Sequence, residues 1–260
     1  MKIAVSGKGG VGKSTVAAAL ALLMARRNRR VLAIDADSDA NLAAALGMSE
    51  TDQDRIIPIA EQVALIEERT GAKVKQYGQL FKLNPEVSDI AEKYATYING
   101  VALLVLGAIS RGGGGCACPE NVLLRALVTD LVLYREDALI MDMEPGVEHL
   151  GRATAQGVDV MLIVVEPGQR SIDSTHRIFR LAEEIGLGNI QLVANKIMRP
   201  EDKDFIREAF PEREIYGFIP YADQILQSDR PGISVLDHLP DKLIGYFDNI
   251  LQRLERQIIN

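Results

Sequence analysis

The feature that most constrains the fold lies at the start of the chain, where a short apolar strand runs into a glycine-rich turn. Residues 3–5 are Ile-Ala-Val, residues 7–14 are Gly-Lys-Gly-Gly-Val-Gly-Lys-Ser, and an Ala/Leu-rich helical pattern begins at Ser14. The turn contains G-x-G-x-x-G, which is typical of dinucleotide-binding folds. It also contains G-x-x-x-x-G-K-[ST], the phosphate-binding loop of nucleoside triphosphatases.

The triphosphate interpretation gives more of these residues a role. Under the dinucleotide alternative, Asp35 at the end of the next strand could bind a ribose, but Lys13 and Ser14 would have no function. In a phosphate loop, Lys13 neutralises the β- and γ-phosphate oxygens and the Ser14 hydroxyl ligates Mg²⁺. Backbone N–H groups and the helix N-terminus surround the β-phosphate. The longer motif is the more specific, and it predicts that nucleotide is bound by Gly9, Gly10, Val11, Gly12, Lys13, Ser14 and Thr15.

Composition and charge exclude several classes of function. The chain has 260 residues, 47% of them hydrophobic, and a net charge of −7 without a basic block, which disfavours non-specific nucleic-acid binding. No apolar run approaches the roughly 20 residues that span a bilayer, and Met1 leads directly into the first strand. Two cysteines indicate reduced thiols or a metal site rather than a disulfide scaffold. We therefore expect a cytoplasmic protein.

Short apolar runs alternate with helical patterns along most of the chain, which predicts one doubly wound, mostly parallel α/β domain over residues 1–260. Asn99-Gly100 predicts a tight hairpin, so that one edge of the sheet is antiparallel. Residues 50–97 are polar and mixed, and should form helices and loops. Strands are expected near 2–6, 31–35, 101–106, 138–142, 159–165, 190–194 and 214–219, and helices at about 14–27, 120–134, 171–186, 201–210 and 241–259.

Acidic residues follow two of the predicted strands. Asp142 ends an apolar run and is expected to act as a carboxylate for Mg²⁺, although it could instead cap a turn. Three acids after the second strand would repel one another unless a cation or a polarised water lies among them. We expect Asp37 to orient or deprotonate the attacking water and Asp39 to approach Mg²⁺. The alternative is a capping cluster for a helix at residues 40–46, with Asp39 as the N-cap.

The end of a later strand indicates which base is bound. Asn195 and Lys196 close that strand, and the Asn195 amide can face a purine edge. A guanine site usually adds a carboxylate two residues after the lysine, whereas this chain has Met198 there. The sequence therefore favours ATP over GTP.

The loop carries an additional lysine, Lys8, and in this it resembles the deviant phosphate loop of the MinD/ParA/nitrogenase iron-protein class of dimerising ATPases. In that class the early lysine reaches across a nucleotide-sandwich dimer to the ATP of the partner, comparable to an arginine finger. The resemblance implies a homodimer in which Lys8 is catalytic together with Lys13 and Asp37. Without the resemblance, Lys8 would be interpreted as a solvated surface lysine.

A second segment narrows the resemblance to one family. Cys116 and Cys118 follow a run of glycines and precede Pro119, and residues 142–151 read Asp-Met-Glu-Pro-Gly-Val-Glu-His-Leu-Gly. This pattern is similar to the CooC family of nickel-insertion ATPases, which mature carbon monoxide dehydrogenase, with close relatives that serve acetyl-CoA synthase. The resemblance implies a nickel-containing client enzyme of one of these two kinds. The acidic net charge and the balanced charges of the last helix indicate no nucleic acid or membrane partner.

The chemistry of the two cysteines agrees with a shared metal site. Two sulfurs one residue apart cannot complete a tetrahedral site, but a two-fold axis would bring Cys116 and Cys118 of two chains together as four thiolates. Such a site suits Zn²⁺, and a square-planar arrangement suits Ni²⁺. The alternative is that the cysteines are small buried apolar residues. His149, nearby, could be a transient ligand but is more often structural.

Two further alternatives remain within the same class of ATPases. An iron–sulfur cluster carrier of the Mrp type also has paired cysteines, although typically as C-x-x-C in the C-terminal half. A MinD/ParA-like positioning ATPase would bind DNA or membrane. The last helix has balanced charges rather than a basic face, so we expect it to dock against the sheet.

Overall fold

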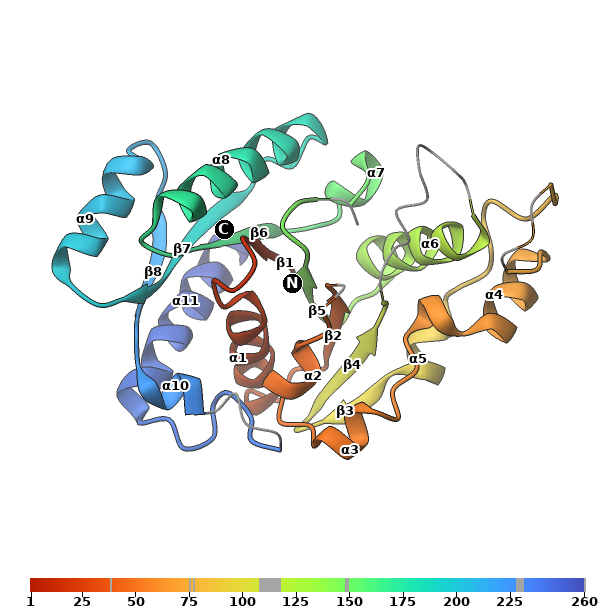
Figure 1. The fold of residues 1–260 in the computed structure, drawn as a ribbon, viewed down its shortest axis with the longest axis horizontal. Coiled ribbons are helices and arrows are strands. Elements are labelled where there is room, and N and C mark those ends of the chain that lie inside the picture. Colours follow the sequence, from red (N-terminus) through yellow and green to blue (C-terminus); the bar gives the residue numbers. More distant parts are fainter. Residues whose placement is uncertain are drawn as a thin grey trace.

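The computed structural model describes residues 1–37, 39–74, 76, 78–107, 118–147, 150–227 and 232–259. The described chain forms one eight-stranded sheet with the order β3-β4-β2-β5-β1-β6-β7-β8 (Figure 1). All neighbouring strands are parallel except β3 and β4. The strands are β1 Lys2–Gly7, β2 Val31–Ala36, β3 Thr96–Ile98, β4 Val101–Val105, β5 Ala138–Met143, β6 Val160–Val165, β7 Ile190–Ile197 and β8 Ile215–Pro220.

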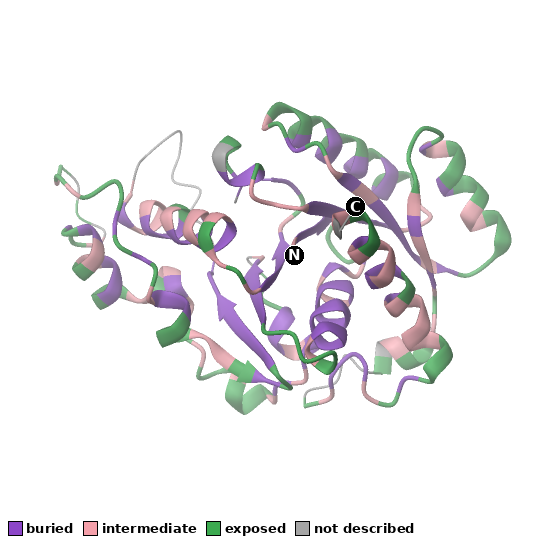
Figure 2. Cartoon of the chain, turned by 180° about the vertical axis from the view of Figure 1, so that it is seen from behind, coloured by how far each residue is buried: buried purple, intermediate pink, exposed green. Residues whose placement is uncertain are grey.

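Helices cover both faces of this sheet, and the sheet separates two hydrophobic cores. One core packs α1, α2 and α11 against the sheet, and the other packs α4, α5, α6, α8 and α9 against the opposite face. Figure 2 shows buried central strands and exposed outer faces on α8 and α9. The helices are α1 Lys13–Arg26, α2 Leu42–Ala45, α3 Glu50–Gln53, α4 Val63–Thr70, α5 Ile90–Tyr94, α6 Pro119–Tyr134, α7 Arg152–Ala155, α8 Gln169–Glu184, α9 Pro200–Ala209, α10 Asp223–Gln227 and α11 Asp241–Ile259, with a 3₁₀ turn at Ile59–Glu61.

The central strands are apolar on both faces because helices bury both sides of the sheet. Every residue of β2, β5 and β6 is buried. The first strand lies between β5 and β6, and the chain then builds outward in both directions. The carboxyl end of β1 is therefore at a switch point of the topology, the place where open α/β sheets bind ligands.

The hairpin expected at Asn99-Gly100 is confirmed. Both residues have positive φ, 47° and 83°, as a type I′ turn requires. The turn joins β3 and β4, and Ile98 pairs with Val101 in the antiparallel ladder at the edge of the sheet. The mostly parallel sheet, the other predicted elements and their order are also confirmed, and most of their ends agree within two residues.

The alternative interpretation of Asp39, as the N-cap of the following helix, is wrong. The helix after β2 begins at Leu42. Its N-cap is Asn41, whose side chain makes no capping hydrogen bond. Instead, Asp35 accepts the Leu42 N–H at 2.9 Å from the end of the strand. A buried strand residue thus holds the start of this helix, and the exposed Asp39 does not.

The last helix, α11, docks against the sheet as expected. Phe247, Ile250, Leu251 and Leu254 form its buried face and belong to the same core as α1. Within the described residues, no helix combines the length and the apolar character that crossing a membrane requires.

Candidate nucleotide-binding site

The glycine-rich loop joins β1 to α1, and two of its glycines are required by their surroundings. A Cβ on Gly7 would lie 2.4 Å from the Val164 carbonyl oxygen, and a Cβ on Gly12 would lie 2.4 Å from Asn195 Nδ2. Gly12 also has a φ of 97°, which disfavours other residues. The loop is therefore pressed against the ends of β6 and β7.

The N-terminus of α1 is open to an anion. Its N-cap is Gly12, which offers no side-chain cap, and no acidic residue lies in its first turn. The first N–H groups of a helix have no partner within the helix, and they carry partial positive charge. An uncapped N-terminus behind a glycine loop has the geometry of a phosphate-binding site.

On one side of the loop, the structure brings Lys13 and Asp37 together. Lys13 Nζ lies 3.2 Å from Asp37 Oδ2, and their side chains are 6% and 13% exposed. Asp39 lies apart from this pair: it is exposed, and its backbone N–H donates to Asp37 Oδ1. Among the described residues, no contact of the Asp39 carboxylate with Lys13, Ser14 or Asp142 is found. The structure thus supports a site at Asp37 and leaves Asp39 without support.

Two further carboxylates lie side by side beneath the loop. Asp35 of β2 and Asp142 of β5 are register partners, and both are fully buried. Burial and the charge of Asp142 raise the pKa of Asp35 to about 8, although it accepts hydrogen bonds from the N–H groups of Leu42 and Asp37. Burial likewise raises the pKa of Asp142 to about 6, while Ser14 and Lys13 favour its charged form. Each of these carboxylates disfavours a second negative charge beside it.

The surroundings of Asp142 fit a divalent cation. Neither of its oxygens has a hydrogen-bond partner of acceptable geometry in the part of the chain that the structure describes, yet both are buried. The Ser14 hydroxyl is close enough to favour the charged carboxylate. A carboxylate and a hydroxyl are oxygen ligands of the kind that Mg²⁺ takes, directly or through water. The Asp142 carboxylate and the Ser14 hydroxyl are therefore chemically suited to hold Mg²⁺.

On the other side of the loop, the end of β7 is fastened to the loop backbone. Asn195 Nδ2 donates to the Val11 carbonyl at 2.8 Å, and Lys196 Nζ donates to the Gly10 carbonyl at 2.5 Å. Lys196 has a φ of 59°, an unusual conformation for lysine that turns its side chain from the strand. Both predicted residues thus lie at the site, but one Asn195 amide hydrogen is already used to hold the loop.

Glu166, which we did not predict, lies between two lysines of the site. It follows β6 directly, and its carboxylate is 3.1 Å from Lys196 Nζ and 3.9 Å from Lys8 Nζ. An acid immediately after an apolar strand is the same signal that identified Asp142, so the sequence pattern could have revealed it. Lys8 is therefore held within its own chain in this structure.

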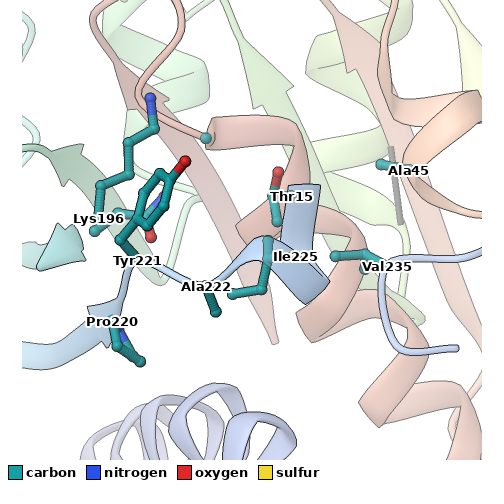
Figure 3. Close-up of a pocket in the computed structure, with 10 residues that line it drawn as sticks. Thr15, Ala45, Lys196, Pro220, Tyr221, Ala222, Ile225 and Val235 are labelled. Carbon is teal, nitrogen blue, oxygen red and sulfur yellow. The ribbon is translucent and has the colours of Figure 1, made fainter. Parts of the chain in front are cut away.

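A pocket beside the loop has mostly apolar walls (Figure 3). It is adjacent to the N-terminus of α1, and no carboxylate lines it among the described residues. The sequence indicated Asn195 and Lys196 but not the walls that β8, α10 and their neighbours supply. The lining residues are Gly12, Thr15, Ala45, Asn195, Lys196, Pro220, Tyr221, Ala222, Ile225 and Val235.

The predicted cysteine site is described only in part. Cys118 immediately precedes α6 and is half-buried, and burial together with nearby Glu120 raises the pKa of its thiol. Cys116 and His149 lie outside the described residues. The pairing of the two cysteines therefore stays a prediction.

A phosphate loop between the central strand and its helix, flanked by buried acids on the neighbouring strand ends, places the molecule in the class of P-loop ATPases. Residues 2–235 match the family model of the CobQ/CobB/MinD/ParA nucleotide binding domain. The carbon monoxide dehydrogenase accessory protein CooC of Rhodospirillum rubrum is 40% identical over 257 residues, which cover 98% of this chain and 97% of that protein. The chain belongs to the CooC-type ATPases of this family, and the resemblance stated from the sequence is confirmed.

One further relative is similar over almost the whole chain, and two solved structures share the fold. An ATP-binding protein of Methanocaldococcus jannaschii is 40% identical over 98% of this chain and 99% of its own length. The fold matches that of MinD from Pyrococcus horikoshii, solved with Mg-ADP, with a TM-score of 0.68 at 21% identity over 98% of this chain and 96% of that one. MinD of Aquifex aeolicus, solved with MinC, also gives 0.68 at 21% identity, over 98% and 95%.

Proposed function

We propose that this chain is a Mg²⁺-dependent, dimerising ATPase that binds a metal ion at a site shared by its two chains. It would assist nickel insertion into carbon monoxide dehydrogenase or acetyl-CoA synthase. The observation that carries the proposal is the 40% identity to a carbon monoxide dehydrogenase accessory protein over almost the whole of both chains. The geometry of the phosphate loop supports the ATPase part. The C-x-C segment supports the metal part.

The roles at the nucleotide follow from the positions of the side chains. Phosphate binds the loop and the N-terminus of α1, and Lys13 exchanges its contact with Asp37 for the phosphate oxygens. Asp37, released from Lys13, is then free to orient or deprotonate the attacking water. Adenine occupies the pocket that Tyr221 and Val235 help to line.

The residues around Asp142 would hold Mg²⁺, through the Ser14 hydroxyl and the Asp142 carboxylate. When bound, the ion neutralises charge on the phosphates. The raised pKa of Asp142, about 6, still leaves the carboxylate mostly charged at neutral pH. Asp35, whose pKa lies near 8, stays mostly protonated there, so the site does not carry two adjacent buried charges.

The dimer supplies the remaining cation. Lys8 is 36% exposed at the tip of the loop, where it can reach the ATP of a second chain. A cation that arrives only when two chains meet makes hydrolysis depend on dimer formation. The same two-fold arrangement would bring Cys116 and Cys118 of both chains into one four-thiolate site for the transported ion.

The metal part is tested by measuring bound metal and oligomeric state together. We expect the wild type to hold about one thiophilic ion per two chains, and Cys116→Ser and Cys118→Ser to lose it. The matched control is Asp37→Asn, which keeps both cysteines and nucleotide binding and should retain the ion while losing turnover. A wild-type protein that binds no thiophilic metal, or binds it fully as a monomer, contradicts the shared site.

A further inference from the structure

Glu166 connects the two lysines that lie on either side of the loop tip. Its side chain is 26% exposed, and those of Lys8 and Lys196 are 36% and 37% exposed. Lys196 is the closer partner, at 3.1 Å against 3.9 Å for Lys8. One carboxylate thus serves two cations, of which one is fixed to the loop backbone and the other is not.

We propose that Glu166 is an intrachain latch on Lys8, and that forming the ATP-bound dimer requires this latch to open. The inference rests on the proposed action of Lys8 on the ATP of a second chain. A lysine paired with Glu166 of its own chain cannot at the same time reach across to a partner. The latch therefore opposes dimer formation and keeps single chains from assembling a catalytic site.

The surroundings allow this contact to open without leaving a charge unpaired. When Lys8 departs, the Glu166 carboxylate keeps Lys196, which is held in place by its hydrogen bond to the Gly10 carbonyl. The loop next to Lys8 is unobstructed, since Gly9 and Gly10 are exposed and a Cβ built on either meets nothing within 4 Å. The lysine is thus the mobile member of the pair and the carboxylate is the fixed one.

The size of the effect follows from the exposure of the contact. A partly exposed ion pair changes an equilibrium by at most about fivefold, and a dimer must open two of them. Removing the latch should therefore tighten the ATP-dependent dimer by about 2- to 25-fold. Removing the negative charge alone would also reduce repulsion between two acidic chains, so a control for charge is needed.

The experiment measures the dimer dissociation constant by sedimentation, with Mg²⁺ and a non-hydrolysable ATP analogue, for the wild type and Glu166→Gln. The control for charge is Glu183→Gln. Glu183 lies on α8, and its carboxylate pairs with Arg213 at 3.3 Å. A second variant, Glu166→Asp, keeps the charge but withdraws it by one methylene from a contact already at 3.9 Å. Affinity for ADP is measured alongside, because it reports on the phosphate loop of single chains.

We expect Glu166→Gln and Glu166→Asp to dimerise more tightly, Glu183→Gln to match the wild type, and ADP affinity to stay within about twofold. The latch is overturned if the Glu166 variants dimerise as the wild type does, or if Glu183→Gln tightens the dimer equally. It is also overturned if ADP affinity falls severalfold, because Glu166 would then act by supporting Lys196. If the wild type itself forms no dimer with the analogue, the proposed function fails as well.

Discussion

The two sides of the phosphate loop are built in opposite ways. On the β2/β5 side, three carboxylates lie close together beside Lys13, two of them fully buried with raised pKa values, and the oxygens of Asp142 have no hydrogen-bond partner of acceptable geometry among the described residues. On the β6/β7 side, the amide of Asn195 and the ammonium of Lys196 both donate to loop carbonyls, and Glu166 completes the contacts.

We call the β2/β5 side the reactive side and the β6/β7 side the supporting side. Carboxylates that are buried and poorly paired are costly in the free protein, and they become favourable when a cation and phosphates arrive. Amides and ammonium groups that already have partners hold the loop in a shape that phosphate can enter without rearrangement. Changes on the first side should therefore affect turnover, and changes to the two donors on the second side, Asn195 and Lys196, should affect affinity and stability.

The largest effect is expected on the reactive side, from Asp37→Asn. Loss of the group that activates water should lower ATP turnover by about 100-fold or more, with nucleotide affinity changed less than about fivefold. Steady-state hydrolysis and ATP-analogue titration measure the two quantities. The matched control is Asp39→Asn, two residues away and exposed, which should lower turnover by less than about threefold. An equal loss in both variants would contradict the assignment of water activation to Asp37 rather than Asp39.

A smaller effect is expected on the supporting side, from Asn195→Ala. The Val11 carbonyl loses its donor, so the free energy of unfolding should fall by about 1–3 kcal/mol and ATP affinity by about tenfold. Asn189→Ala is the control, since that side chain donates to the Asp159 carbonyl at the other end of β7. It should lose comparable stability in a chemical denaturation experiment and bind ATP normally. Normal ATP binding by Asn195→Ala would break the distinction between the two sides.

The smallest effect concerns the pH dependence of stability in the absence of nucleotide and Mg²⁺. The pKa of Asp142 is raised from 3.8 to about 6, so the folded state favours the protonated acid. Its contribution to stability is fully present below pH 4 and is lost as the pH rises through about 6. Asp142→Asn should therefore be more stable than the wild type above pH 6, by about 1–3 kcal/mol, and equal to it near pH 4. A constant difference across this range would mean that Asp142 is not strained by burial.

Much of the reactive side could be predicted from the sequence, because it follows local rules. An apolar strand that ends in an acid, such as the one before Asp142, places a carboxylate at the carboxyl edge of a parallel sheet. The supporting side was harder to predict, because its contacts join residues far apart in the chain. Glu166 meets Lys8 across 158 positions, and no local pattern of either residue indicates the other. The pocket walls around Tyr221 have the same origin, since they are set by how β8 and α10 pack.

The local pattern did not decide the position of the Asp39 side chain. We expected Asp37 to act on the attacking water and Asp39 to approach Mg²⁺, but the strand ends at Ala36, and of these two acids only Asp37 contacts Lys13. Asp35 is buried and accepts the N–H of Leu42, Asp37 meets Lys13, and Asp39 is exposed. The sequence specifies the spacing of these acids, but the point at which the backbone leaves the sheet decides which of them face inward.

The central claim, that each ATP site is completed by a lysine from a second chain, is tested most directly by mixing two inactive variants. Lys8→Ala and Asp37→Asn should each hydrolyse ATP poorly alone. In a mixed dimer, the Lys8→Ala chain keeps its own Asp37 and receives Lys8 from its partner, so one site is intact. An equal mixture should regain about one quarter of wild-type turnover, because half the dimers are mixed and each has one working site. No recovery, with mixed dimers shown to form, would contradict the claim and place Lys8 in its own chain's site.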